Sequence, residues 1–133
     1  MPGRVLGERA SQAGMVAVLL VEDDRDVRES IVEILEAEGY VVVPMSSAGA
    51  ALGVLEQPAA PALVLLDLKM PGMDGLSFLN ALRARPDRDR FRVILMSADR
   101  AVTNLRDAPG VVAVLKKPFE GSELLELLQR HVT

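Results

Sequence analysis

The sequence predicts an α/β fold: one doubly wound, five-stranded parallel sheet with helices on both faces. Five short apolar runs alternate with segments of helical periodicity, and this alternation implies right-handed crossovers between parallel strands. The runs are continuously apolar, which is typical of strands buried on both faces. At 133 residues, the chain is long enough for one such domain. Acids or other polar residues follow four of the runs, so the same edge of the sheet is the expected site of function.

The first half of the chain contains three of the predicted strands and two helices. The apolar runs predict strands at residues 16–21, 40–43 and 62–66. Residues 25–38 carry an apolar helical stripe, with Asp24 placed to cap the helix and Gly39 to end it. A second helix is expected from Ser46 or Ser47 through Glu56. Pro44 follows the second of these apolar runs.

The second half continues the alternation. A helix that begins after Gly75 is expected to place Leu76, Leu79 and Leu82 inward, and a charged loop follows it. Strands are predicted at residues 91–96 and 111–115. Between them, residues 99–107 contain poor helix formers and predict a short, weak helix. The last helix is expected at residues 120–131.

The composition excludes several classes of protein. The chain has no cysteine, and its single histidine, His131, cannot build a metal cluster. The net charge of −4 argues against a nucleic-acid surface, and no apolar run approaches the roughly 20 residues of a membrane span. Residues 1–15 lack the apolar core of a signal peptide and are expected to form a flexible tail. We therefore expect a cytoplasmic protein without membrane insertion.

Charged and hydroxyl side chains gather at the predicted carboxyl edge of the sheet. Taken alone, Asp67 could equally be a turn cap, but it shares this edge with Glu22 and Asp23, with Ser97 and with Lys117. Neighbouring carboxylates repel by about 4 kcal/mol at 4 Å in an effective dielectric of 20. A hard cation such as Mg²⁺ would offset this repulsion. Together with the lysine and the hydroxyl, it would form a site for a phosphoryl group.

Four motifs carry a resemblance to a known family, and each lies at a predicted strand end. They read Leu-Leu-Val-Glu22-Asp23-Asp24, Leu-Leu-Asp67-Leu-Lys-Met-Pro-Gly-Met-Asp-Gly, Ile-Leu-Met-Ser97-Ala98 and Lys117-Pro118-Phe119. The chain resembles the receiver domain of two-component response regulators, which has the chemotaxis-type, flavodoxin-like fold. The resemblance implies the strand order 2-1-3-4-5 and a receiver domain at residues 16–133.

The resemblance also implies a role for each motif residue. Asp67 would accept a phosphoryl group from a histidine kinase or a histidine phosphotransfer protein. Asp23 and Asp67 would bind Mg²⁺ directly. Lys69 would add its backbone carbonyl, and Glu22 would act through a water molecule. Ser97 would bind a phosphoryl oxygen and Lys117 would pair with the acyl phosphate, with a cis peptide bond before Pro118.

The expected output is a switch rather than an enzymatic activity. Phosphorylation would alter the surface of residues 99–107, 111–115 and 120–131, where a downstream effector protein would bind. Receivers often carry Tyr or Phe three residues before the lysine, but this chain has Val114. Two alternatives remain: a receiver module of a longer regulator or hybrid histidine kinase, and a Mg²⁺-dependent aspartyl-phosphate phosphatase. The phosphatase would commonly carry Asp-x-Asp at Asp67, where Lys69 stands instead.

Overall fold

A computed structural model describes residues 16–68, 75–98 and 108–132 of the chain. Its elements are β1 (Ala17–Val21), α2 (Arg25–Ala37), β2 (Val41–Met45), α3 (Ala48–Leu55), β3 (Leu63–Asp67), α4 (Gly75–Arg83), the 3-10 turn η1 (Arg88–Arg90), β4 (Arg92–Ser97), β5 (Val111–Lys116) and α5 (Gly121–His131). The strands form one parallel sheet in the order β2-β1-β3-β4-β5. The predicted fold class and strand order are confirmed. No helix in this part of the chain combines the length and the apolar character needed to cross a membrane.

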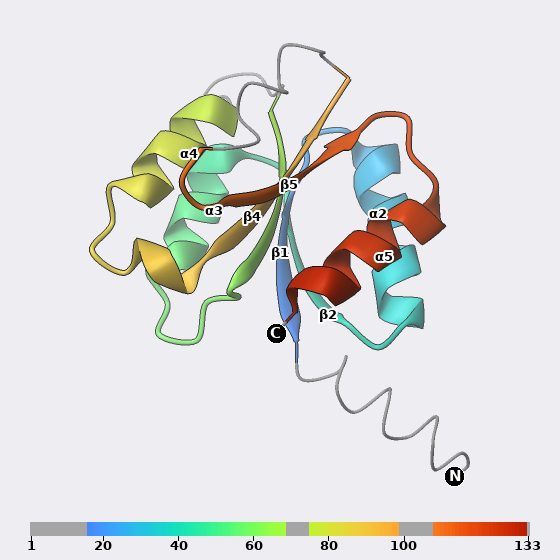
Figure 1. The fold of residues 1–133 in the computed structure, drawn as a ribbon, viewed down its shortest axis with the longest axis horizontal. Helices are drawn as coiled ribbons and strands as arrows, with labels where there is room; N and C mark the ends of the chain where they lie inside the picture. The colour runs from blue at the N-terminus through green and yellow to red at the C-terminus, as the bar shows by residue number, and fades with distance from the viewer. Residues whose placement is uncertain (1–15, 69–74, 99–107, 133) are drawn as a thin grey trace, which may run out of the picture.

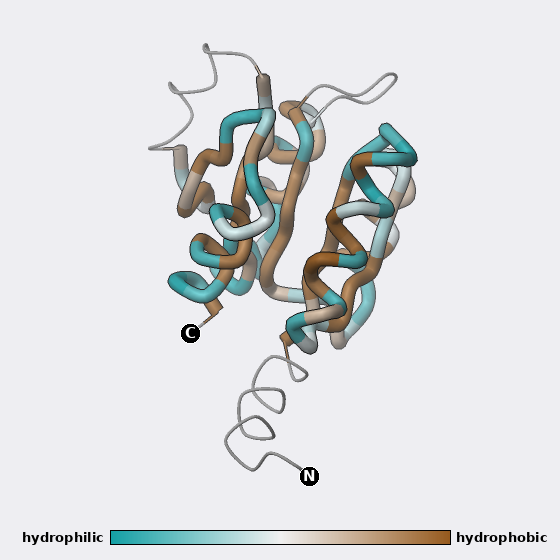
Figure 2. Tube along the Cα trace, turned by 90° about the vertical axis from the view of Figure 1, so that its right-hand side faces the viewer, coloured by the Kyte–Doolittle hydropathy of each residue, from teal (hydrophilic) through white to brown (hydrophobic). Residues whose placement is uncertain are grey.

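The two faces of the sheet are covered by different pairs of helices (Figure 1). Alternate strand residues such as Leu19 and Leu66 pack with α3 and α4. Their neighbours Leu20 and Leu65 pack with α2 and α5 on the opposite face. Burying each such side chain stabilises the fold by about 1.5–3 kcal/mol. Apolar residues therefore fill the strands almost continuously, as the brown central segments of Figure 2 show.

The helix ends follow the sequence signals. The Asp24 side chain accepts a hydrogen bond from the amide of Val27 at the start of α2, and Ser47 caps α3 in the same way. Gly39, just after α2, has a φ of 93°, which favours glycine. A capping box that joins Glu120 and Glu123 begins α5. Residues 1–15 and 99–107, predicted as a tail and a weak helix, lie outside the described residues.

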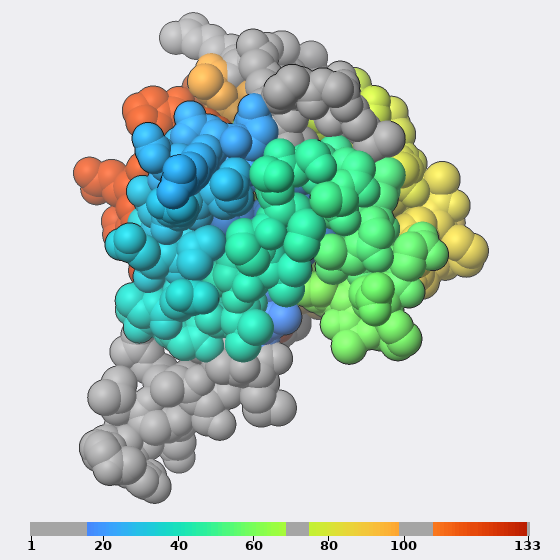
Figure 3. Space-filling view, turned by 180° about the vertical axis from the view of Figure 1, so that it is seen from behind, coloured from blue at the N-terminus to red at the C-terminus, as the bar shows by residue number. Residues whose placement is uncertain are grey.

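The predicted end of the second strand was wrong. The strand was predicted at residues 40–43, but β2 continues through Pro44 to Met45. β2 is an edge strand, and the Val41 amide donates to the carbonyl of Val16 in β1. Since backbone groups alternate along a strand, residue 44 faces outward, where its missing N–H removes no bond to β1. Figure 3 shows this edge from outside, between α2 and α3.

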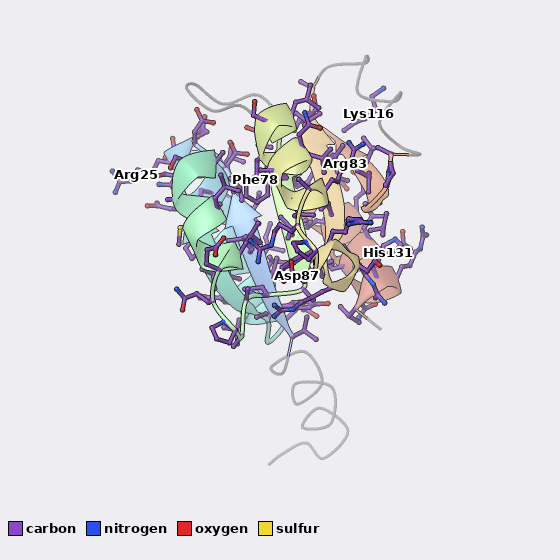
Figure 4. The ribbon with its side chains drawn as sticks, turned by 90° about the vertical axis from the view of Figure 1, so that its left-hand side faces the viewer. Arg25, Phe78, Arg83, Asp87, Lys116 and His131 are labelled. Carbon is purple, nitrogen blue, oxygen red and sulfur yellow. The ribbon has the colours of Figure 1, made fainter. Side chains whose placement is uncertain are left out.

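The predicted inward face of α4 was partly wrong. Leu76 is 44% exposed, whereas Phe78 is fully buried together with Leu79 and Leu82. The buried stripe starts at Gly75 and recurs after three, four and seven residues, so Leu76 falls beside it. In Figure 4, Phe78 lies between the helices and the sheet.

The charged segment after α4 is a surface loop, as predicted, and it is tied to α3. Arg85 donates through Nη1 to Glu56 at 2.8 Å, through Nη2 to the carbonyl of Leu55 at 3.2 Å and through Nε to Asp87 at 2.8 Å. The hydrogen bond from Arg85 holds the pKa of the Asp87 carboxyl below its usual range. The arginines of this segment therefore pair within the fold rather than form a uniformly basic surface.

Candidate functional site

Three carboxylates meet at the carboxyl edge of the sheet. β1 and β3 are neighbours, with Val21 opposite Leu66, so Glu22 and Asp67 emerge side by side. One oxygen from each of Glu22, Asp23 and Asp67 lies within 4.8 Å of the others. Glu22 is fully buried, Asp67 is 4% exposed and Asp23 is half-buried. The structure thus brings these predicted residues together.

Backbone contacts hold the turn that carries Glu22 and Asp23. The Glu22 amide donates to the carbonyl of Met45 at 3.0 Å, and the Asp24 amide donates to Oε2 of Glu22 at 3.2 Å. From α2, Arg28 donates through Nη1 to the carbonyl oxygens of Glu22 and Asp23, at 2.9 and 3.3 Å. The turn is therefore held by hydrogen bonds with both β2 and α2.

Lys117 supplies positive charge to the cluster. Its Nζ lies 2.8 Å from Oε1 of Glu22 and 3.5 Å from Oδ2 of Asp67. Its amide donates to the carbonyl of Ser97 at 2.9 Å, and the predicted cis bond to Pro118 is present. The adjacent Lys116 is exposed, as expected of a solvated edge residue (Figure 4).

Burial dominates the protonation of Glu22. It raises the pKa of this carboxyl from 4.5 to about 7; the hydrogen bond from Lys117 acts against this rise, and the neighbouring Asp67 adds to it. Burial also acts to lower the pKa of Lys117, but the contacts with Glu22 and Asp67 outweigh it and raise that pKa above its ordinary value. A lysine therefore holds its charge beside a carboxyl that binds a proton more readily than usual.

Ser97 and Gly75 border the cluster. Ser97 ends β4 and is 1% exposed. Gly75 begins α4, and its amide donates to the carbonyl of Leu68 at 3.1 Å. A Cβ atom at Gly75 would overlap the carbonyl oxygen of Asp67 and the Cα of Leu68. Only glycine therefore allows this helix to begin against the end of β3.

The site contains residues that the sequence reading did not assign. Arg28 falls within the predicted helix at residues 25–38, but helical periodicity gives no sign of its contacts with the acidic turn. Gly75 was expected only to precede a helix. Lys69, the predicted donor of a carbonyl ligand, lies outside the described residues.

The donor set suits a hard divalent cation. Carboxylate oxygens are the protein ligands that Mg²⁺ prefers, commonly one or two of them with water and phosphate oxygens. The cluster provides three carboxylates, two of them buried, and their mutual repulsion favours a cation. The described residues therefore fit a hard divalent cation, of which Mg²⁺ is one.

Comparison of the sequence with known proteins gives one family. The pattern of the response regulator receiver domain matches residues 18–129. Response regulator protein FleR of Pseudomonas aeruginosa is 45% identical over 118 residues, which make up 86% of this chain and 24% of FleR. Sporulation initiation phosphotransferase F of Bacillus subtilis is 28% identical over 117 residues, 86% of this chain and 92% of that protein.

Solved structures show the same relationship. A putative two-component system response regulator/GGDEF domain protein superposes with a TM-score of 0.84 at 31% identity, covering 94% of this chain and 52% of the other. Chemotaxis protein CheY4 of Vibrio cholerae superposes with a TM-score of 0.77 at 25% identity, covering 90% and 99%. The chain thus spans a quarter to a half of some relatives and nearly all of others.

Proposed function

Because the chain belongs to the response regulator receiver domain family, we propose that it is a phosphorylatable signalling switch whose phosphoacceptor is Asp67. The observation that carries this proposal is the placement of Asp67, which ends a central strand beside two further carboxylates and 3.5 Å from the Lys117 ammonium. A nucleophilic carboxylate and a cation beside it are what phosphoryl transfer requires.

The proposed step is a displacement at phosphorus. A carboxylate oxygen of Asp67 forms the new O–P bond, and the bond from phosphorus to the histidine nitrogen of the donor breaks, returning its electron pair to the imidazole. Lys117 pairs with the phosphoryl oxygens, and the Ser97 hydroxyl binds one of them. Bound Mg²⁺, held by Asp23 and Asp67 directly, by Glu22 through water and by the Lys69 carbonyl, would neutralise the negative charge.

The donor would be a histidine kinase or a histidine phosphotransfer protein, and a downstream effector would read the result. The name of the Bacillus subtilis relative, a phosphotransferase, supports a place in phosphoryl relay. We expect no enzymatic output from this domain and a cytoplasmic location. Since the chain spans 24% of FleR, the reading as a receiver module of a longer regulator stands beside that of a separate receiver protein.

Phosphorylation by a small donor tests the proposal. We expect acetyl phosphate with Mg²⁺ to add one phosphoryl group to the protein, measured as intact mass, and Asp67→Asn to remove the gain while keeping the circular dichroism spectrum. The exposed Asp89 provides the control, Asp89→Asn, which should be phosphorylated normally. An equal mass gain in Asp67→Asn would contradict the assignment.

A further inference from the structure

Arg28 contacts the acidic turn from outside the cluster. It lies in α2, and its guanidinium points back past the first turn of this helix to the residues that follow β1. One nitrogen, Nη1, donates to two successive carbonyl oxygens, those of Glu22 and Asp23, at 2.9 and 3.3 Å. The side chain is half-buried. Arg25, one turn earlier, is 78% exposed and pairs only with Glu29 among the contacts of the described residues.

These contacts act on the direction of the carboxylates. The orientation of a peptide plane is set when its carbonyl is held, and with it the direction of the neighbouring Cα–Cβ bond. The carboxylate oxygens of Glu22, Asp23 and Asp67 lie within 4.8 Å of one another and repel. This repulsion favours a rotation of the Asp23 side chain away from the other two carboxylates. Hydrogen bonds from a charged donor are about twice as strong as neutral ones, and here they oppose that rotation.

We propose that Arg28 is a positioning residue for the metal site. By holding the carbonyls of Glu22 and Asp23 on the α2 side, it keeps both carboxylates directed toward Asp67, which raises the affinity of the free protein for a divalent cation. The inference rests on the proposed function, since it assigns a role at the same site. It assigns Arg28 no contact with the phosphoryl group.

Charge alone predicts the opposite effect, and this makes the proposal testable. A guanidinium near a cation site repels the cation, so if charge dominated, Arg28→Met would bind Mg²⁺ more tightly than the wild type and Arg28→Lys would match it. If positioning dominates, both variants bind more weakly, because lysine keeps the charge but its ammonium ends one bond short of the position from which Nη1 contacts both carbonyls.

The test compares four proteins: the wild type, Arg28→Met, Arg28→Lys and the control Arg25→Met. Calorimetric titration gives the Mg²⁺ affinity of each in the absence of a phosphodonor. Intact mass then gives the rate of acetyl phosphate labelling as a function of Mg²⁺ concentration. Circular dichroism in EDTA checks that each variant is folded. If Arg28→Met does not fold, the conservative variant Arg28→Lys still tests the proposal.

We expect both Arg28 variants to bind Mg²⁺ about tenfold more weakly, a typical effect of losing a contact that orients a ligand. The Mg²⁺ concentration for half-maximal labelling should rise to match, while the rate at saturating Mg²⁺ stays at the wild-type level and Arg25→Met behaves as wild type. Affinities equal to that of Arg25→Met, normal affinity in Arg28→Lys alone, or a loss of maximal rate at unchanged midpoint would each overturn the proposal. A wild type that is not labelled would instead refute the proposed function.

Discussion

The ammonium of Lys117 lies near two carboxylates. It is closer to Glu22, at 2.8 Å, than to Asp67, at 3.5 Å. A buried carboxylate without such a partner would be costly, because desolvation penalises the charged form. Even with this partner, the pKa of Glu22 is raised to about 7. The lysine therefore offsets only part of the burial cost.

The first prediction concerns pH. Between about pH 4.5 and 7, the folded protein keeps a proton on Glu22 that the unfolded chain releases, so the free energy of unfolding falls as the pH rises through this window. The contribution is at most about 1.4 kcal/mol per pH unit. We expect Glu22→Gln to remove it, as measured by urea unfolding in EDTA from pH 5 to 8. Glu29→Gln, at an exposed position, serves as the control. Parallel pH profiles for the wild type and Glu22→Gln would contradict the prediction.

The two acids that follow Glu22 should behave differently. Asp23 belongs to the carboxylate cluster, so we expect Asp23→Ala to weaken Mg²⁺ binding at least tenfold in calorimetry. Asp24 caps α2, so Asp24→Ala should cost about 1 kcal/mol of stability and leave the Mg²⁺ affinity near the wild-type value. The amide of residue 24, which contacts Glu22, is kept in both variants. Equal Mg²⁺ affinities of Asp23→Ala and Asp24→Ala would contradict this prediction.

At the scale of elements, two helical glycines provide a matched pair. A Cβ at Gly75 would collide with the backbone of Asp67 and Leu68, whereas a Cβ at Gly53 in α3 meets nothing within 4 Å. We expect Gly75→Ala to destabilise the protein by about 1–3 kcal/mol and to slow phosphorylation by displacing Asp67. Gly53→Ala should stabilise it by up to about 1 kcal/mol. Urea unfolding of both variants checks this. An equal effect of the two substitutions would show that α4 does not press on β3.

Element types followed from local patterns, and their errors came from tertiary context. The apolar runs identified the strands: β1, β3 and β4 are buried almost throughout, and the edge strands β2 and β5 are partly buried. The end of the second strand was misjudged because nothing local distinguishes an edge strand, which tolerates proline, from a central one. Leu76 was misjudged because the buried stripe of α4 depends on where Gly75 meets β3. These placements arise from packing between distant segments.

At the scale of the molecule, the prediction concerns how the signal leaves the site. Val114 is half-buried and packs with the core on the α3 and α4 side. A branched aliphatic side chain lacks the reach of the aromatic that receivers often carry there. We therefore predict that residues 99–107 rearrange on activation, and with them the surface of residues 111–115 and 120–131.

Hydrogen exchange with and without beryllofluoride, a phosphoryl mimic, measures this rearrangement. Protection should change more at residues 99–107 than in α2, with Asp67→Asn as the unresponsive control. A response confined to α2 would place the output surface elsewhere.

Some residues of the site could be predicted from the sequence and others could not. Glu22, Asp23, Asp67 and Lys117 were identified because strand ends in a parallel sheet meet at one edge. Arg28 was missed because its target is backbone, which leaves no complementary residue in the sequence. The sequence therefore indicates the side chains at strand ends that would contact a ligand, but it does not indicate side chains that act on them through backbone contacts.

The outward-facing proline of β2 has a consequence for association. An unpaired strand edge is a template on which other chains can add strands and grow aggregates. Within β2, the alternation leaves only Val42 to offer an outward N–H, because Pro44 at the other outward position has none. Incoming strands therefore find too few donors for a continuous ladder. This edge therefore resists fibril growth.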